Sequence, residues 1–114
     1  MRKVKVKICG LKRTQDIECV NKLLPDYIGF VFAKTKREVT EQQAAQLKAM
    51  LNPQIKAVGV FVNAEIDLIA RLAASRTIDI IQLHGDEDAA YCERLRLQTE
   101  LPIIKAVRVK DAGS

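Results

Sequence analysis

The chain alternates short apolar runs with longer segments in which apolar residues recur at helical spacing. The apolar runs predict five β-strands, at residues 4–9, 27–32, 55–62, 78–83 and 102–109. The four segments between them predict α-helices. Strands that are apolar along nearly their whole length are typical of parallel sheets with covered faces, so the pattern predicts an α/β fold.

The predicted helices have recognisable ends. The first is expected at residues 14–24. Thr40 is expected to cap the second, with Gln43 completing a capping box. Asn63 is expected to cap the third, and Gly85-Asp86 to start the fourth. The residues that we expect the helices to bury are Ile17, Val20, Leu23, Leu24, Ala44, Leu47, Leu51, Ile66, Ile69, Ala70, Ala73, Tyr91, Cys92 and Leu95.

The spacing of the strands limits the choice of architecture. They begin near residues 4, 27, 55, 78 and 102, so each strand–helix unit occupies about 24.5 residues. Eight such units would need about 196 residues, near the lower size limit of a (β/α)8 barrel. The chain holds four units and a fifth strand. It is therefore either a five-stranded open sheet or half a barrel, and the spacing alone does not decide between these two interpretations.

Composition excludes several classes of protein. With 48% hydrophobic and 29% charged residues, the chain is an ordinary globular one. No apolar run reaches the roughly 18 residues of a membrane helix, and the first residues lack a signal-peptide core. Three cysteines without a CxxC pair argue against a disulfide framework or a zinc site, so a cytoplasmic location is expected. The net charge of +5 can attract anions, but the few aromatic residues lie apart from the basic ones, which disfavours nucleic-acid binding.

Polar and reactive residues follow the predicted strands at their carboxyl ends, where parallel α/β folds place their active sites. Cys9 and Gly10 end the first strand, and a loop with Arg37 follows the second. Asn63 follows the third strand and His84 the fourth. Taken singly, Cys9 also fits a small buried residue, His84 a structural histidine and Arg37 a solvated loop residue. The other members of this set are Lys34, Lys36, Gln82 and Gly85.

Strand parity adds a constraint on Cys9. Lys5, Lys7 and Cys9 alternate with apolar residues, so they are expected to face away from the helices. Gln82 and His84 share a face in the same way. A lysine two residues from Cys9 favours the thiolate over the thiol. Cys9 is therefore the cysteine most suited to act as a base.

Four segments carry a more specific pattern. They are residues 7–11 (KICGL), 25–33 (PDYIGFVFA) with 35–37 (TKR), 58–63 (VGVFVN) and 82–87 (QLHGDE). In this order they resemble the motifs of the phosphoribosylanthranilate isomerase family of tryptophan biosynthesis. One departure is Thr35, where the family commonly has serine, and the hydroxyl is kept.

The resemblance implies a (β/α)8 TIM barrel and an Amadori rearrangement of N-(5-phosphoribosyl)anthranilate to 1-(2-carboxyphenylamino)-1-deoxyribulose 5-phosphate. It implies that Cys9 is the general base and that Arg37 binds the anthranilate end of the substrate. His84 and Gln82 are implied to bind substrate at the mouth of the site. The resemblance implies no cofactor and no metal.

The resemblance covers only the first half of such a barrel. The family's general acid, an aspartate on the sixth strand, and its phosphate-binding loops have no counterpart in this chain. Residues 1–114 are therefore expected to form one partial domain that is inactive alone. Its expected partners are the phosphorylated substrate and either a second copy or the missing half, without nucleic acid or membrane. The alternative is a non-catalytic open α/β module that acts by binding or self-association.

Overall fold

The computed structural model describes residues 7–10, 13–32 and 38–105, with the backbone alone at residues 7–9. Strands and helices alternate along the chain, as predicted. The second, third and fourth strands are shorter than expected, and residues 4–6 and 106–109 of the predicted first and fifth strands lie outside the described residues. The elements are β1 (Lys7–Cys9), α1 (Thr14–Leu23), β2 (Tyr27–Val31), α2 (Glu41–Met50), β3 (Lys56–Phe61), α3 (Ile66–Ala74), β4 (Ile80–Leu83), α4 (Ala89–Arg96) and β5 (Ile103–Lys105).

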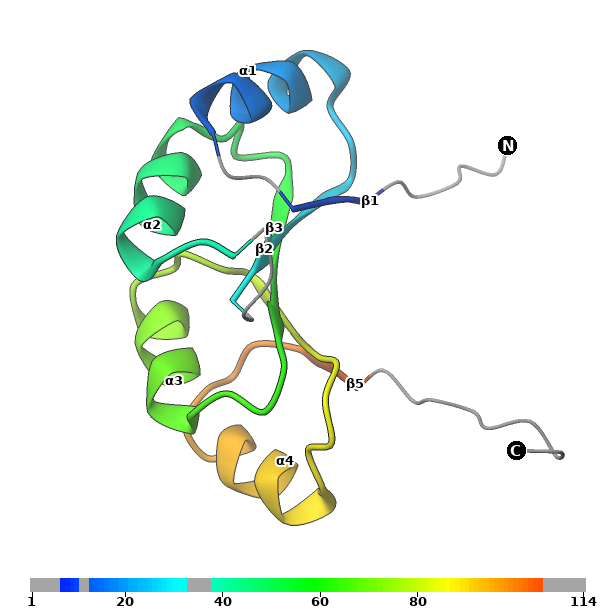
Figure 1. Cartoon of the computed structure of the whole chain (residues 1–114), viewed down its shortest axis with the longest axis vertical. Coiled ribbons are helices and arrows are strands. Elements are labelled where there is room, and N and C mark those ends of the chain that lie inside the picture. The colour runs from blue at the N-terminus through cyan, green and yellow to red at the C-terminus, as the bar shows by residue number, and fades with distance from the viewer. Residues whose placement is uncertain (1–6, 11–12, 33–37, 106–114) are drawn as a thin grey trace, which may run out of the picture.

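The five strands form one parallel sheet in the order β1-β2-β3-β4-β5. The helices α1 to α4 lie along one side of this sheet, and the two layers curve together into an arc (Figure 1). Sequential order with all helices on one face is the arrangement of a (β/α)8 barrel, whereas an open doubly wound sheet has helices on both faces. The half-barrel prediction is confirmed.

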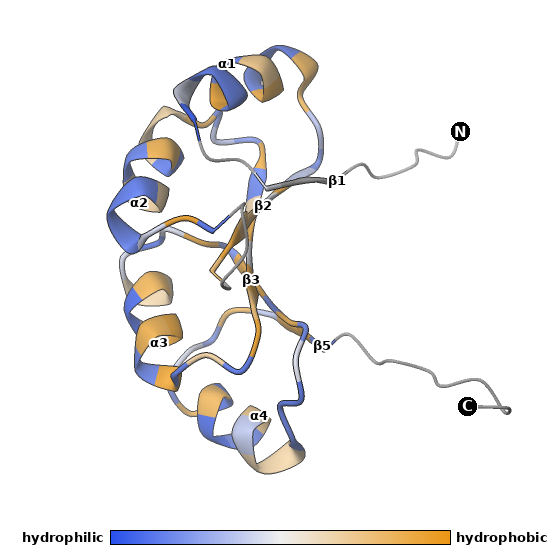
Figure 2. Ribbon diagram, in the orientation of Figure 1, coloured by the Kyte–Doolittle hydropathy of each residue, from blue (hydrophilic) through white to orange (hydrophobic). Residues whose placement is uncertain are grey.

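The hydrophobic core lies between the sheet and the helices. Ile28 and Phe30 of β2, Phe61 of β3, and Ile81 and Leu83 of β4 are fully buried on this side. Hydrophobic residues run along the strands and alternate with hydrophilic ones in the helices (Figure 2). The buried residues that the helices contribute are Ile17, Val20, Ala44, Leu47, Ile69, Leu72 and Leu95.

The opposite face of the sheet is the concave face of the arc. Val31, Val60, Gln82 and Ile104 are register partners across four neighbouring strands, and they alternate with the residues of the core. Val31, Val60 and Gln82 are half-buried, and Ile104 is 50% exposed. The alternation along β4 confirms that Gln82 faces away from the helices.

Two predicted helix ends are wrong. Asn63 does not cap α3, because the residue before this helix is Glu65 and Asn63 bonds elsewhere. Gly85-Asp86 does not start α4, which begins after Asp88 with the Asp88 carboxylate accepting from the Tyr91 N–H at 2.8 Å. The capping box of Thr40 and Gln43 is confirmed. Both errors have one cause: the segments after β3 and β4 bond each other, because the Asp86 N–H donates to Asn63 Oδ1 and neither residue enters a helix.

The predicted buried face of α1 extends too far. Leu23 is 66% exposed and Leu24 is 51% exposed, because α1 ends there and Leu24 adopts a left-handed φ of 50°. In α3 the fully buried residues are Ile69 and Leu72, whereas Ala70 is half-buried. No helix in the described part of the chain is long and apolar enough to span a membrane.

Candidate functional site

The carboxyl ends of the strands meet at one edge of the sheet, and two predicted site residues lie there. Cys9 is the last residue of β1, and His84 directly follows β4. Strands β2 and β3 lie between them, and the sheet register places Cys9 level with Ile80, four residues before His84. Arg37, Lys34, Lys36, Lys5 and the side chains of Lys7 and Cys9 lie outside the described residues.

The backbone at both positions is firmly bonded. Gly10 adopts a φ of 84°, which favours glycine, and its N–H donates to the Gly29 carbonyl at 3.0 Å. The His84 N–H donates to the Phe61 carbonyl at 2.8 Å, and the imidazole is exposed. Gln82 lies two residues earlier on the concave face. The sheet edge therefore presents His84 to solvent on a fixed backbone.

A buried carboxylate connects the ends of three neighbouring strands. The Glu87 side chain is 0% exposed and lies in the loop between β4 and α4. It accepts from the Asn63 N–H at 2.8 Å, from the Gly85 N–H at 2.9 Å and from the Lys105 ammonium at 2.9 Å. The Lys105 ammonium also donates to the Gly85 carbonyl. This network joins the residues that follow β3 and β4 to the last residue of β5.

Hydrogen bonding decides the charge of Glu87. Burial raises the pKa of this carboxyl group, but hydrogen bonds from the Lys105 ammonium and from the backbone N–H groups of Asn63, Glu87 and Gly85 lower it by more, so the net shift is downward. Glu87 is therefore ionised at neutral pH. A buried charge is tolerated when it is paired and hydrogen-bonded, and Glu87 meets both conditions.

Asn63 reinforces the same loop. It has a left-handed φ of 50°, and its Oδ1 accepts from the Asp86 N–H at 2.9 Å. Nearby, the Tyr91 hydroxyl donates to the Ala64 carbonyl at 2.6 Å and so ties α4 to the segment after β3. Burial, followed by the Glu87 charge, raises the pKa of Tyr91 to about 12. Tyr91 is therefore a neutral donor at neutral pH.

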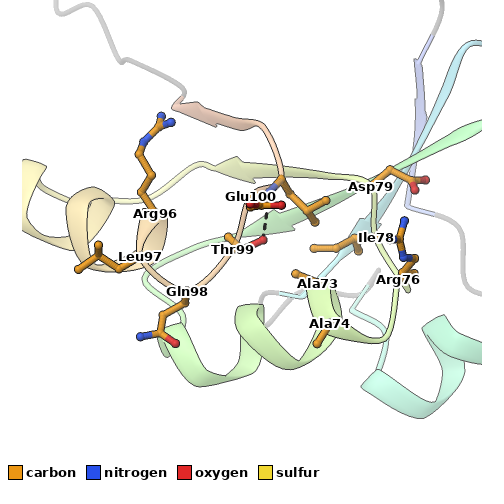
Figure 3. A pocket seen from close by; sticks show the side chains of 11 residues that line it. Ala73, Ala74, Arg76, Ile78, Asp79, Arg96, Leu97, Gln98, Thr99 and Glu100 are labelled. Atoms are coloured by element: carbon orange, nitrogen blue, oxygen red, sulfur yellow. Dashed lines mark hydrogen bonds between the residues drawn. The ribbon is translucent and has the colours of Figure 1, made fainter.

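A cavity lies at the other end of the sheet. It has a volume of about 720 Å3 and is bounded by Arg76 and Asp79 on one side and by Arg96 and Gln98 on the other (Figure 3). This end holds the amino ends of β4 and β5, which in barrel enzymes serve stability rather than catalysis. Asp79 there accepts from the Ala57 N–H and pairs with Lys48 at 3.0 Å. The cavity is separate from the candidate site.

Sequence reasoning missed two members of the site. A helix that starts at Gly85-Asp86, as the sequence predicts, would hold Glu87 in its first turn, and the pattern assigns Lys105 only to the fifth strand. The one available signal was the position of Lys105 in an apolar strand, where a charged residue needs a partner. Nothing in the local pattern identified Glu87, 18 residues earlier, as that partner.

Comparison with known proteins places the chain in a family. The family model described as N-(5'phosphoribosyl)anthranilate (PRA) isomerase matches residues 6–113. N-(5'-phosphoribosyl)anthranilate isomerase of Lachnoclostridium phytofermentans is 51% identical over 94% of this chain and 49% of its own length. The protein of that name from Endomicrobium trichonymphae is 50% identical over 94% and 54%. The chain spans about half the length of the curated relatives it matches.

Solved structures agree in fold. Monomers generated from the dimeric phosphoribosylanthranilate isomerase of Thermotoga maritima match with a TM-score of 0.84 and 34% identity, over 97% of this chain and 56% of that one. The Thermus thermophilus enzyme matches with a TM-score of 0.81 and 29% identity, over 94% and 53%. A phosphoribosylanthranilate isomerase in complex with reduced 1-(o-carboxyphenylamino)-1-deoxyribulose 5-phosphate matches with a TM-score of 0.81 and 34% identity, over 95% and 55%. By the family match over nearly its whole length, this chain belongs to the N-(5'-phosphoribosyl)anthranilate isomerase family.

Proposed function

We propose that this chain forms the strand β1 to β5 half of a phosphoribosylanthranilate isomerase, an aldose–ketose isomerase of tryptophan biosynthesis. The observation that carries the proposal is the common edge shared by Cys9 and His84, in a chain that matches the family over residues 6–113. The proposed substrate is N-(5-phosphoribosyl)anthranilate. A family structure that holds the reduced product supports a phosphorylated sugar as the ligand.

In the proposed mechanism a general acid first protonates the furanose ring oxygen, and the ring opens to a Schiff base. The Cys9 thiolate then removes the C2 proton, and the electron pair moves to give an enolamine. Tautomerisation of the enolamine yields the aminoketose, so no electrons leave the substrate. Arg37 is proposed to bind the anthranilate end, and Gln82 and His84 to line the mouth. The base and the acid must each lie within hydrogen-bond reach of the proton that they transfer.

The family resemblance assigns the general acid and the phosphate loops to the other half of the barrel. We propose that residues 1–114 alone are inactive, because loss of a general acid typically costs about 10²–10⁴-fold in rate. The described sheet ends at β1 and β5, and strand edges pair with further strands. The proposed partner for these edges is the complementary half of a family member or a second copy of the chain.

A fusion tests the proposal. Residues 1–105 would be joined to the segment of the Lachnoclostridium phytofermentans relative that follows its counterpart of residue 105, and aminoketose formation would be followed by mass spectrometry. We expect turnover by the fusion, loss of at least about 100-fold with Cys9→Ser, and no turnover by residues 1–114. A folded fusion without turnover would contradict the proposed function. Turnover by residues 1–114 that Cys9→Ser abolishes would show that the acid is misassigned.

A further inference from the structure

The three consecutive backbone N–H groups from His84 to Asp86 all donate to parts of the chain outside β4. The His84 N–H donates to the Phe61 carbonyl at 2.8 Å. The Gly85 N–H donates to Glu87 Oε1 at 2.9 Å, and the Asp86 N–H donates to Asn63 Oδ1 at 2.9 Å. The direction in which the peptide leaves His84 is therefore determined by Glu87 and Asn63.

Glu87 is the central residue of this arrangement. Its carboxylate bonds the residue after His84 and, at the same time, the Asn63 N–H and the Lys105 ammonium. Lys105 in turn donates to the carbonyl of Gly85. The peptide groups on both sides of Gly85 thus have partners in one ion pair, and that pair is anchored on β5.

We propose that the Glu87–Lys105 ion pair is a positioning device that sets the orientation of His84 at the mouth of the active site. Glu87 does not contact the reacting atoms, and its effect on the reaction passes through His84. The catalytic part of this inference rests on the proposed function, since it requires that His84 bind substrate. The structural part, that Glu87 orients His84, does not depend on it.

A second carboxylate supplies the matched control. Asp79 accepts from the Ala57 N–H at 2.8 Å and pairs with Lys48 at 3.0 Å, so it combines a backbone donor and a lysine as Glu87 does. It precedes β4, whereas Glu87 follows the strand. Asp79→Asn therefore disturbs a similar interaction at the end of the sheet remote from His84.

The chain contains one histidine, so the imidazole NMR signals report on His84 without assignment. The first experiment uses the 114-residue chain and compares Glu87→Gln with Asp79→Asn. Glutamine keeps the size of the side chain but places an NH2 group against one of the N–H donors or Lys105. We expect Glu87→Gln to shift or broaden the imidazole signals and Asp79→Asn to leave them unchanged. Unchanged signals in folded Glu87→Gln would overturn the inference.

Lys105→Gln is the second variant, for the case in which Glu87→Gln does not fold. Lys105 is 30% exposed, and its removal leaves Glu87 with two backbone donors, so this variant disturbs the loop less. We expect Lys105→Gln also to shift or broaden the imidazole signals of His84. If Lys105→Gln leaves the signals unchanged, Lys105 is not part of the device and the proposal fails.

The second experiment is a double-mutant cycle in the active fusion. A misplacement of about 1 Å can cost about 100-fold in rate, so we expect Glu87→Gln to lower kcat/KM by about 10-fold to 100-fold. In a His84→Ala background the same change should have almost no further effect, because it acts through the missing imidazole. Full additivity would overturn the positioning role. Absence of turnover in the unsubstituted fusion would instead count against the proposed function and leave the NMR result standing.

Discussion

The backbone of Gly85 lies directly against Asn63. A Cβ atom on Gly85 would stand 2.9 Å from the Asn63 Oδ1 and 3.0 Å from its backbone nitrogen. These two residues follow β4 and β3, so the contact sets how closely the two strand ends approach. It also explains why a residue without a side chain comes next to His84.

Gly85→Ala should therefore destabilise the chain. The added methyl group would meet the Asn63 backbone, which cannot move without disturbing the Glu87 bond. Overpacking of this kind typically costs about 1–3 kcal/mol, and urea unfolding followed by far-UV circular dichroism measures it. A stability equal to that of the unsubstituted chain would show that the loop has room to shift.

Glu87 should make the chain sensitive to acid. Its pKa in the folded chain lies below the ordinary value of 4.5, so the unfolded chain binds the proton more readily. The contribution of Glu87 is therefore complete above the unfolded pKa and is lost as the pH falls through the folded one. In urea unfolding between about pH 7 and pH 3, Glu87→Gln should flatten the fall in stability on the acid side. An unchanged slope would contradict the ion-pair assignment.

Tyr91 should lose its phenolic proton only at unusually high pH. Its pKa of about 12 follows first from burial and then from the nearby Glu87 charge. An absorbance titration of the phenolate should show a step near pH 12, and Tyr91→Phe should remove that step. The substitution also removes the hydrogen bond to the Ala64 carbonyl, which should cost about 1 kcal/mol in unfolding free energy. A late step that persists in Tyr91→Phe would assign it to another group.

Two leucines of the α4 region offer a direct comparison of burial. Leu95 is 0% exposed, whereas Leu97 is 84% exposed. Leu95→Ala should lower the unfolding free energy by about 2–5 kcal/mol, because it leaves a cavity between α4 and the sheet. Leu97→Ala should change it by less than about 0.5 kcal/mol. Equal effects of the two changes would mean that α4 does not pack on the sheet as described.

Cys9 should be the most reactive of the three cysteines. Its place at a strand end and the lysine two residues earlier favour the thiolate, whereas Cys19 is merely exposed and Cys92 half-buried. Timed alkylation at neutral pH, read by peptide mass spectrometry, should label Cys9 before Cys19 in the folded chain. Faster labelling of Cys19 would remove the support for Cys9 as the base.

Features that depend on neighbours along the chain were predictable from the sequence. The apolar runs and helical spacing gave the order of elements, and the Thr40–Gln43 capping box follows from two residues three positions apart. The half-barrel followed from the strand spacing together with the family motifs. Cys9 and His84 were placed at one edge because the carboxyl ends of parallel strands always meet there.

Features that depend on contacts across the sheet were decided only by the tertiary structure. The buried pair of Glu87 and Lys105 joins residues that become neighbours only through the register of β4 and β5. The position of Asn63 in the sequence predicts a helix cap. In the structure its side chain instead accepts a hydrogen bond from the Asp86 N–H, which follows the neighbouring strand β4. Periodicity assigns Leu23 to the buried face of α1, yet the residue is 66% exposed at the end of that helix. In each case the partner or the exposure of the side chain depends on residues distant in sequence. The local pattern of residues therefore does not predict it.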